Sequence, residues 1–97
     1  MSSDHQPVVV DRAGAEQVLR SEGLSPHGWG NGPGDTYGWH EHPYEKVLYC
    51  VAGSIAFHTE DGDRPLSAGD RMELPAHTRH AATVGPDGCQ CVEASRY

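Results

Sequence analysis

Residues 34–53 read GDTYGWHEHPYEKVLYCVAG, and this stretch decides the fold. It places His40 and His42 two positions apart. Side chains two positions apart on a β-strand share a face, so both imidazoles converge on one point, whereas on a helix they would diverge. Pro43 disfavours a helix, and the apolar, β-branched and aromatic residues that follow favour a strand ending at the turn signal of residues 52–54.

A pair of imidazoles needs a third donor to hold a transition metal firmly. His80 supplies it in this interpretation. It closes a second block, residues 69–80, which reads GDRMELPAHTRH: a turn, a short strand, a proline corner and a histidine. The two blocks are interpreted as halves of one metal site, with His40, His42 and His80 as the ligands.

Length and composition indicate one small all-β domain. The chain has 97 residues with 12 glycines and 7 prolines, which is typical of short strands joined by tight turns. We expect a single domain over residues 1–97, with its core at about 34–95 and a flexible tail at 1–10. A core of this size needs a compact barrel or a partner subunit, so a homodimer is expected.

The net charge excludes two classes of partner. At −7, the chain would be repelled by nucleic-acid phosphates and by anionic membrane surfaces. It has no apolar run long enough to span a bilayer, and its polar opening lacks the regions of a signal peptide. We therefore expect a cytoplasmic protein that binds neither nucleic acid nor membranes.

Local patterns place the remaining elements. Asp11 is the expected N-cap of a short helix that stops at Gly23. Residues 46–51 and 54–59 are predicted to form a hairpin, and a turn at 85–88 is predicted to separate the last two strands. The odd-numbered Tyr37 and Trp39 are expected to face away from the two even-numbered histidines.

The three cysteines favour structural roles. Cys89 and Cys91 are too close in sequence for an ordinary disulfide framework, and an odd count suits free thiols in a reducing compartment. We interpret them as small buried residues on strands. Cys50 has the same even phase as His40 and His42, so it is predicted to line the pocket, where the alternatives are a soft ligand or a redox-sensitive thiol.

The first block resembles the first motif of the cupin superfamily. That motif is Gly, five residues, His-x-His, three or four residues, Glu, six residues and Gly. Gly34, His40, His42 and Gly53 occupy the corresponding positions. The glutamate is replaced by Lys46.

The second block is similar to the second cupin motif, which is Gly, five residues, Pro-x-Gly, two residues, His, three residues and Asn. Gly69, Pro75 and His80 match it. His77 stands where the motif has its second glycine, and Val84 replaces the asparagine. The resemblance extends from residue 34 to about residue 84.

The missing glutamate leaves two arrangements open. In a regular strand Lys46 shares a face with the histidines, lines the pocket and repels a cation unless it turns away or loses its proton. A β-bulge near Pro43 would instead turn Glu45 inward. The regular strand is preferred because the spacing from Lys46 to Gly53 is that of the family.

The resemblance implies an RmlC-like antiparallel jelly-roll barrel, or double-stranded β-helix, with the short N-terminal helix outside it. It also implies a divalent transition metal (Fe, Mn, Ni, Cu or Zn) held by the three histidines, and a small-molecule ligand or substrate. An oxygenase or isomerase acting on a small organic molecule is one hypothesis. The alternative is a non-catalytic binding or sensing protein with a degenerate metal site. His77 and Arg79 are weighed as pocket groups, with surface roles preferred.

Overall fold

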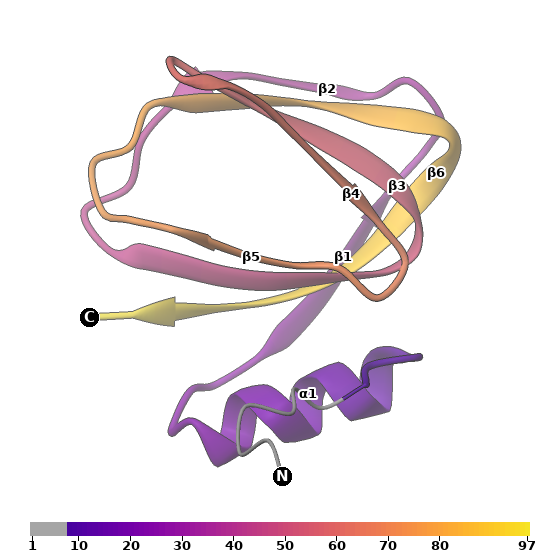
Figure 1. Cartoon of the computed structure of the whole chain (residues 1–97), viewed down its shortest axis with the longest axis vertical. Helices are drawn as coiled ribbons and strands as arrows, with labels where there is room; N and C mark the ends of the chain where they lie inside the picture. The colour runs from indigo at the N-terminus through magenta and orange to yellow at the C-terminus, as the bar shows by residue number, and fades with distance from the viewer. Residues whose placement is uncertain (1–7) are drawn as a thin grey trace, which may run out of the picture.

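The computed structural model describes residues 8–97 as one helix and six strands (Figure 1). The elements are α1 (Arg12–Ser21), β1 (His27–Asn31), β2 (Thr36–His40), β3 (Glu45–Thr59), β4 (Gly62–Ser67), β5 (Arg71–Leu74) and β6 (His80–Arg96). Every strand pairing is antiparallel. The predicted jelly roll with a short N-terminal helix is thereby confirmed. Of the expected tail, residues 1–7 lie outside the described residues, and Val9 is buried.

Two long strands, β3 and β6, form the frame of the barrel. They pair with each other from Glu45↔Arg96 to Thr59↔His80. The first half of β3 also pairs with β5 and its second half with β4, while β6 pairs with β2 near its start and with β1 near its end. Each long strand therefore runs through both layers of the barrel, and bending them together encloses the interior.

The predicted hairpin of residues 46–51 and 54–59 is wrong, as is the predicted turn at 85–88. Both segments lie inside continuous strands, and the register shifts on either side of residues 52–53 show that β3 bends there. Gly53 (φ 69°) and Gly88 (φ 76°) meet at this corner. The glycines that predicted turns mark the bend of β3 and β6. The two halves of β3 do not pair with each other, because each half pairs with β6 and with a further strand of its own.

Replacing Gly53 by alanine is expected to destabilise the protein by about 3 kcal/mol or more, since a Cβ there would overlap the carbonyl oxygen of Gly88 and the residue has positive φ. Gly34 is the matched control: it also has positive φ, but a Cβ there meets nothing within 4 Å. Gly34→Ala should therefore cost only about 1 kcal/mol. Urea unfolding followed by tryptophan fluorescence measures both. Equal losses would contradict the close approach at Gly53.

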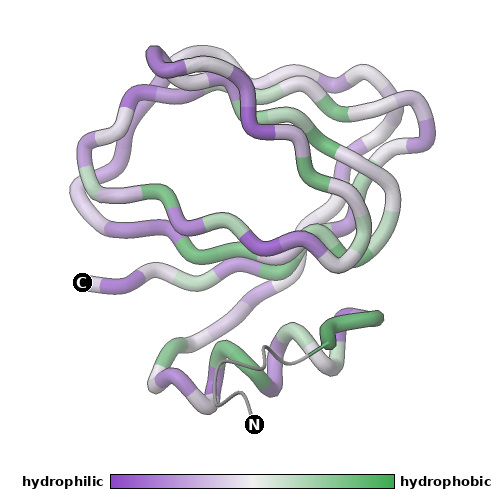
Figure 2. Tube along the Cα trace, in the orientation of Figure 1, coloured by the Kyte–Doolittle hydropathy of each residue, from purple (hydrophilic) through white to green (hydrophobic). Residues whose placement is uncertain are grey.

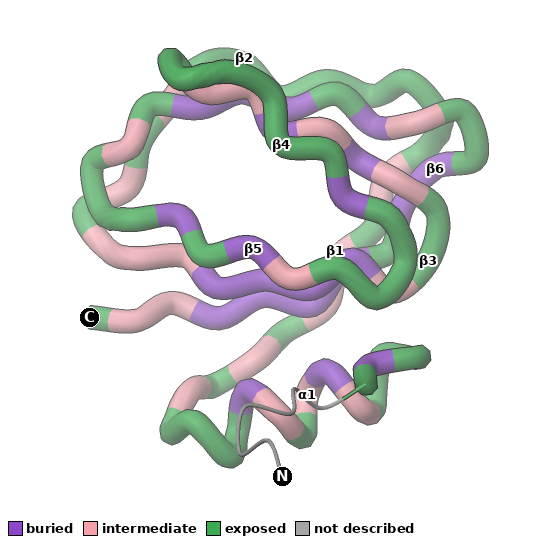
Figure 3. The backbone as a smooth tube through the Cα atoms, viewed as in Figure 1, coloured by how far each residue is buried: buried purple, intermediate pink, exposed green. Residues whose placement is uncertain are grey.

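The helix covers one outer face of the barrel. Asp11 caps α1 by accepting a hydrogen bond from the Gly14 amide at 2.8 Å, and Gly23 (φ 81°) follows its end, as predicted. The axis of α1 lies beside the outer face of the barrel (Figures 1 and 3). Its residues Ala15 and Leu19 are fully buried in a cluster with outward side chains of β3 and β6. No helix among residues 8–97 has the length and apolarity needed to cross a membrane.

The parts of β3 and β6 that pack against α1 are buried on both faces, and apolar segments recur along both strands (Figure 2). The outer cluster lies under the helix and consists of Val9, Ala15, Leu19, Val47, Tyr49, Val92 and Ala94. The inner cluster fills part of the barrel and consists of Leu48, Cys50, Ile55, Phe57, Leu66, Met72, Leu74, Ala82, Val84, Cys89 and Cys91. The rest of the interior contains polar side chains.

Candidate metal centre

Three histidines from two parts of the chain meet at one end of the barrel. His40 ends β2, His42 lies in the following loop and His80 begins β6, opposite His40 in the ladder. One ring nitrogen of each lies within 4.8 Å of the others. The loops of residues 41–44 and 75–79 close this end (Figure 1) and are joined by a 2.7 Å hydrogen bond from the His77 amide to the His42 carbonyl oxygen. The sheet register and this loop contact together position the three rings.

Backbone carbonyls fix the tautomers of two of the rings. The Nδ1 of His40 lies 2.6 Å from the Gly38 oxygen, and the Nδ1 of His80 lies 2.8 Å from the Thr78 oxygen. A carbonyl can only accept, so each Nδ1 carries the proton and donates it. This leaves the Nε2 lone pair of both rings free, which is the arrangement of a metal-binding histidine whose second nitrogen is anchored.

Two ring nitrogens of the three histidines are buried without a hydrogen-bond partner. The Nε2 atoms of His42 and His80 are shielded from solvent and make no hydrogen bond to the described part of the chain. An unsatisfied buried polar atom costs about 1–3 kcal/mol, so a fold retains such atoms where something else satisfies them. A divalent transition metal accepting three imidazole nitrogens would do so, and the donor set therefore fits the metal that the two motifs imply.

Burial lowers the pKa of His42, and the nearby positive charge of Lys46 lowers it further. Burial is also the main cause that lowers the pKa of His80, opposed by its hydrogen bond to Thr78. A lowered pKa favours the neutral ring at neutral pH. Both imidazoles are therefore held in the form whose lone pair can bind a metal.

Lys46 and Glu45 lie on opposite faces of β3. The Lys46 side chain is 12% exposed and its Nζ lies 3.5 Å from Glu93 Oε1, inside the barrel. Glu45 instead accepts a 2.6 Å hydrogen bond from Arg96. The pairing of β3 with β6 is thus regular from Glu45 to Cys50, and the position that resembles the family's glutamate presents an ammonium group to the histidines.

Glu93 is the residue that sequence reasoning missed. It is buried, and besides Lys46 it accepts a 2.7 Å hydrogen bond from the Trp29 indole Nε1. Strand alternation with Cys89 and Cys91 places it on the inner face. That alternation was visible in the sequence, but residues 91–94 are buried on both faces, so the pattern alone gave no direction. The carboxylate absent from position 46 is therefore present on the neighbouring strand.

A family model for the Cupin domain matches residues 25–92. The chain belongs to the cupin family. No curated protein gives a significant match to it. The structural comparisons agree with the family, because solved cupin and RmlC-like structures superpose on this fold.

Three of these structures illustrate the similarity. A chain from the crystal structures of the DMSP lyases RdDddP and RnDddQII is 33% identical with a TM-score of 0.70, over 76% of this cupin and 38% of that chain. KdgF from Halomonas sp. is 28% identical (TM-score 0.65), over 76% and 69% of the two chains. An RmlC-like cupin from Shewanella frigidimarina is 25% identical (TM-score 0.66), over 76% and 67%. This cupin thus spans well under half of the matched lyase chain.

Cys50 faces the interior of this cupin but lies away from the histidines. Its thiol donates to backbone oxygens of Ala52 and Gly53 at the bend of β3, and Cys91 is its partner across the ladder. Within residues 8–97, the group of converging ligand atoms contains the three histidines and no cysteine. Cys50 thus packs in the apolar end of the barrel, and the structure does not bring it to the histidines as a soft ligand.

The expectation that Tyr37 faces away from the histidines is wrong. One extra residue in β2, between the pairs Tyr37↔Ala82 and His40↔His80, shifts the register. Such a bulge turns two residues of opposite phase to the same face. Tyr37 lies opposite Ala82 of the inner cluster, and its ring makes an edge contact with Trp29 at 6.0 Å. Both side chains remain exposed, Tyr37 at 39% and Trp39 at 48%.

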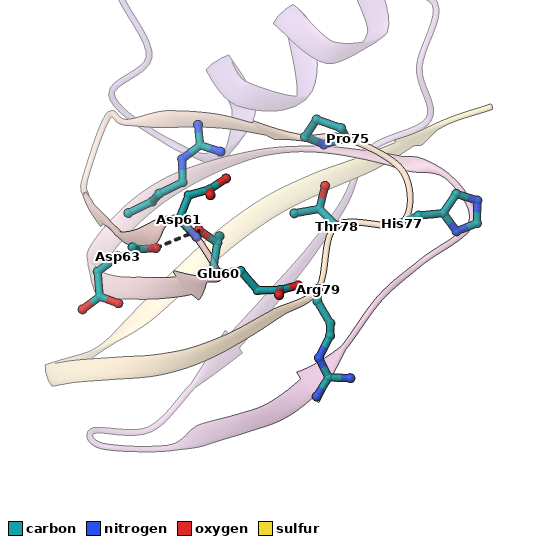
Figure 4. A pocket seen from close by; sticks show the side chains of 10 residues that line it. Glu60, Asp61, Asp63, Pro75, His77, Thr78 and Arg79 are labelled. Carbon is teal, nitrogen blue, oxygen red and sulfur yellow. Dashed lines mark hydrogen bonds between the residues drawn. The ribbon is translucent and has the colours of Figure 1, made fainter.

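His77 and Arg79 lie on the surface beside the site. Figure 4 shows them around an open cavity of about 470 Å³ between the β3–β4 turn and the loop of residues 75–79. His77 lies 3.2 Å from Glu41, and the Arg79 guanidinium stacks over Trp39 at 5.8 Å. The cavity is lined by Thr59, Glu60, Asp61, Gly62, Asp63, Arg64, Pro75, His77, Thr78 and Arg79. None of the three converging histidines contributes to it.

His77→Gly is expected to raise the free energy of unfolding by about 0.5–1 kcal/mol. His77 has φ 61°, a left-handed conformation that costs a side-chain-bearing residue about 1–2 kcal/mol. The cupin motif has glycine at this position, and the exposed ion pair with Glu41 that would be lost contributes little. Chemical denaturation measures the change, with His77→Ala as the control that removes the ring and keeps the strain. A destabilised His77→Gly would contradict the strain.

Proposed function

We propose that this cupin binds one divalent transition metal through His40, His42 and His80, and that it acts with the metal on a small organic molecule inside the barrel. The observation that supports this most directly is the pair of buried, unpartnered Nε2 atoms directed at one point. When bound, the metal would supply Lewis-acid or redox chemistry, and three neutral histidines leave coordination positions for a ligand.

Oxygenase and isomerase reactions both suit a three-histidine centre with open positions. The similarity to a chain from the DMSP lyase structures adds a lyase reaction as a third reaction type, although that chain is much longer than this one. In each case the protein would supply the shielded interior, the fixed imidazoles and the charged pair of Lys46 and Glu93. Iron, manganese, nickel, copper and zinc all remain candidates.

A non-catalytic binding or sensing protein is the second candidate. The observation that favours it is Lys46, whose ammonium occupies the position that resembles the family's metal-binding glutamate. A positive charge there opposes a cation. In this case the barrel would hold a small molecule without turnover, with the metal site weakened or lost.

An exchangeable position on the bound metal would distinguish the two candidates. Metal-free protein is titrated with cobalt(II), and its visible spectrum is then followed as azide is added. A saturable, stoichiometric cobalt spectrum that azide alters would support an open centre. A cobalt spectrum that azide leaves unchanged would favour a filled structural site, and no cobalt binding at all would contradict the proposed function.

We also propose a cytoplasmic homodimer. Cys50, Cys89 and Cys91 are free thiols, which suits a reducing compartment. Exposed aromatic side chains, including Trp39 and Tyr97, provide apolar surface that a second copy could cover. Sedimentation equilibrium on the purified protein tests the dimer, and a monomer at all concentrations would overturn it.

A further inference from the structure

The metal hypothesis gives no role to the buried ammonium group of Lys46. The side chain lies inside the barrel at the start of β3, directly after the loop that carries His42, and is only 12% exposed. A lysine this buried is uncommon unless its charge is balanced or used. The polar contacts of the Lys46 ammonium therefore indicate which kind of ligand it could pair with.

The hydrogen-bonding capacity of Lys46 is not filled by the protein. The nearest acceptor, Glu93 Oε1, is 3.5 Å from Nζ, which is long for a charge-assisted hydrogen bond. That oxygen is engaged more closely by the Trp29 indole, at 2.7 Å. An ammonium group has three donors. Within the described part of the chain, Lys46 makes this ion pair and no shorter polar contact.

The charges of the site leave an excess of positive charge once a metal is bound. The three imidazoles are neutral ligands, and the single charges of Lys46 and Glu93 cancel. A divalent cation would therefore bring two uncompensated positive charges into a poorly solvated interior, where charge is costly. In the family motif a glutamate ligand removes one of them. Here that position is a lysine, so an anionic ligand would supply the missing negative charge.

We infer that the site takes a small organic carboxylate, one oxygen of which pairs with the Lys46 ammonium while another donor of the same molecule faces the three histidines. This inference rests on the proposed metal function and specifies its substrate class. Glu93 acts as a positioning residue: Trp29 fixes its carboxylate, and the carboxylate holds Lys46 toward the histidines. The shielding of the two Nε2 atoms favours a ligand of few atoms.

Glycolate and its neutral isostere glycolamide, each titrated into cobalt(II)-loaded protein and followed by the visible spectrum, test this inference. The wild type should prefer glycolate. Lys46→Met keeps the length of the side chain and removes the charge, so it should weaken glycolate binding about tenfold or more and leave glycolamide binding unchanged. Lys46→Arg should retain the preference, which separates loss of charge from damage to the fold.

Arg79→Met is the matched control, because it removes an exposed cation near the same end of the barrel. It should bind glycolate as the wild type does. If cobalt-loaded Lys46→Met bound glycolate with wild-type affinity, this inference would be overturned and the proposed metal function would stand. The same would follow if only Arg79→Met lost glycolate affinity. Wild type that binds no cobalt would overturn the proposed function and this inference with it.

Discussion

His80→Ala is expected to lower the affinity of the metal-free protein for zinc by at least about 100-fold. Removing one of three histidine ligands costs more than the 10–100-fold typical of losing a group that only supports a ligand. His80 is also the most buried of the three and is anchored to the Thr78 carbonyl, so its loss removes a preorganised ligand. Competition with a chromophoric zinc chelator measures the affinity.

His58→Ala is the matched control for that experiment. The His58 ring points outward from β3, where it contacts Asp63 and Thr83 at 2.8 Å each. Its removal should leave zinc affinity unchanged within error. Because truncating a buried side chain also affects folding, His80→Gln serves as a second variant that fills more of the space. A zinc affinity within threefold of wild type in both His80 variants would exclude His80 as a ligand.

Lys46→Glu is expected to tighten metal binding by about tenfold or more while destabilising the metal-free protein. It gives position 46 the residue that the cupin motif has there and adds a negative charge beside the three histidines. Without metal, the new carboxylate would repel Glu93, its present ion-pair partner. The increase in melting temperature on adding zinc should therefore be larger than in wild type.

Lys46→Gln separates the two effects of that substitution. It also breaks the ion pair with Glu93, but it adds no negative charge. Its zinc affinity should fall between those of wild type and Lys46→Glu. If Lys46→Glu bound zinc no more tightly than wild type, the inward position of residue 46 beside the metal would be contradicted.

Much of the architecture could be predicted from local sequence signals. The apolar run of residues 47–51 indicated a strand, and the two motif blocks indicated a jelly roll. The prediction that His40 and His42 share a strand is wrong, because β2 ends at His40 and His42 lies in the loop that follows. The helix boundaries followed from Asp11 and Gly23, which act through the capping hydrogen bond and the positive φ seen in the structure. Such signals depend on only a few neighbouring residues, so they can be recognised without knowing the fold.

Features set by distant partners could not be predicted. Gly53 reads as a turn, yet it is a bend, because β6 pairs with β3 on both sides of it. The face of the sheet on which Tyr37 lies depends on an extra residue in β2 that only the pairing with β6 reveals. Glu93 joins Lys46 across the sheet from 47 positions further along the chain. Each of these features is a property of strand register, which the local sequence does not specify.

The metal content of untagged protein purified without chelators tests the central claim most directly. Elemental analysis should find close to one transition-metal ion per chain in wild type and almost none in His42→Ala, whose Nε2 is one of the two buried, unpartnered nitrogens. The wild type should also recover its metal after stripping and reloading. No metal in wild type, even after incubation with iron, zinc, nickel or copper, would contradict a three-histidine metal centre in this cupin.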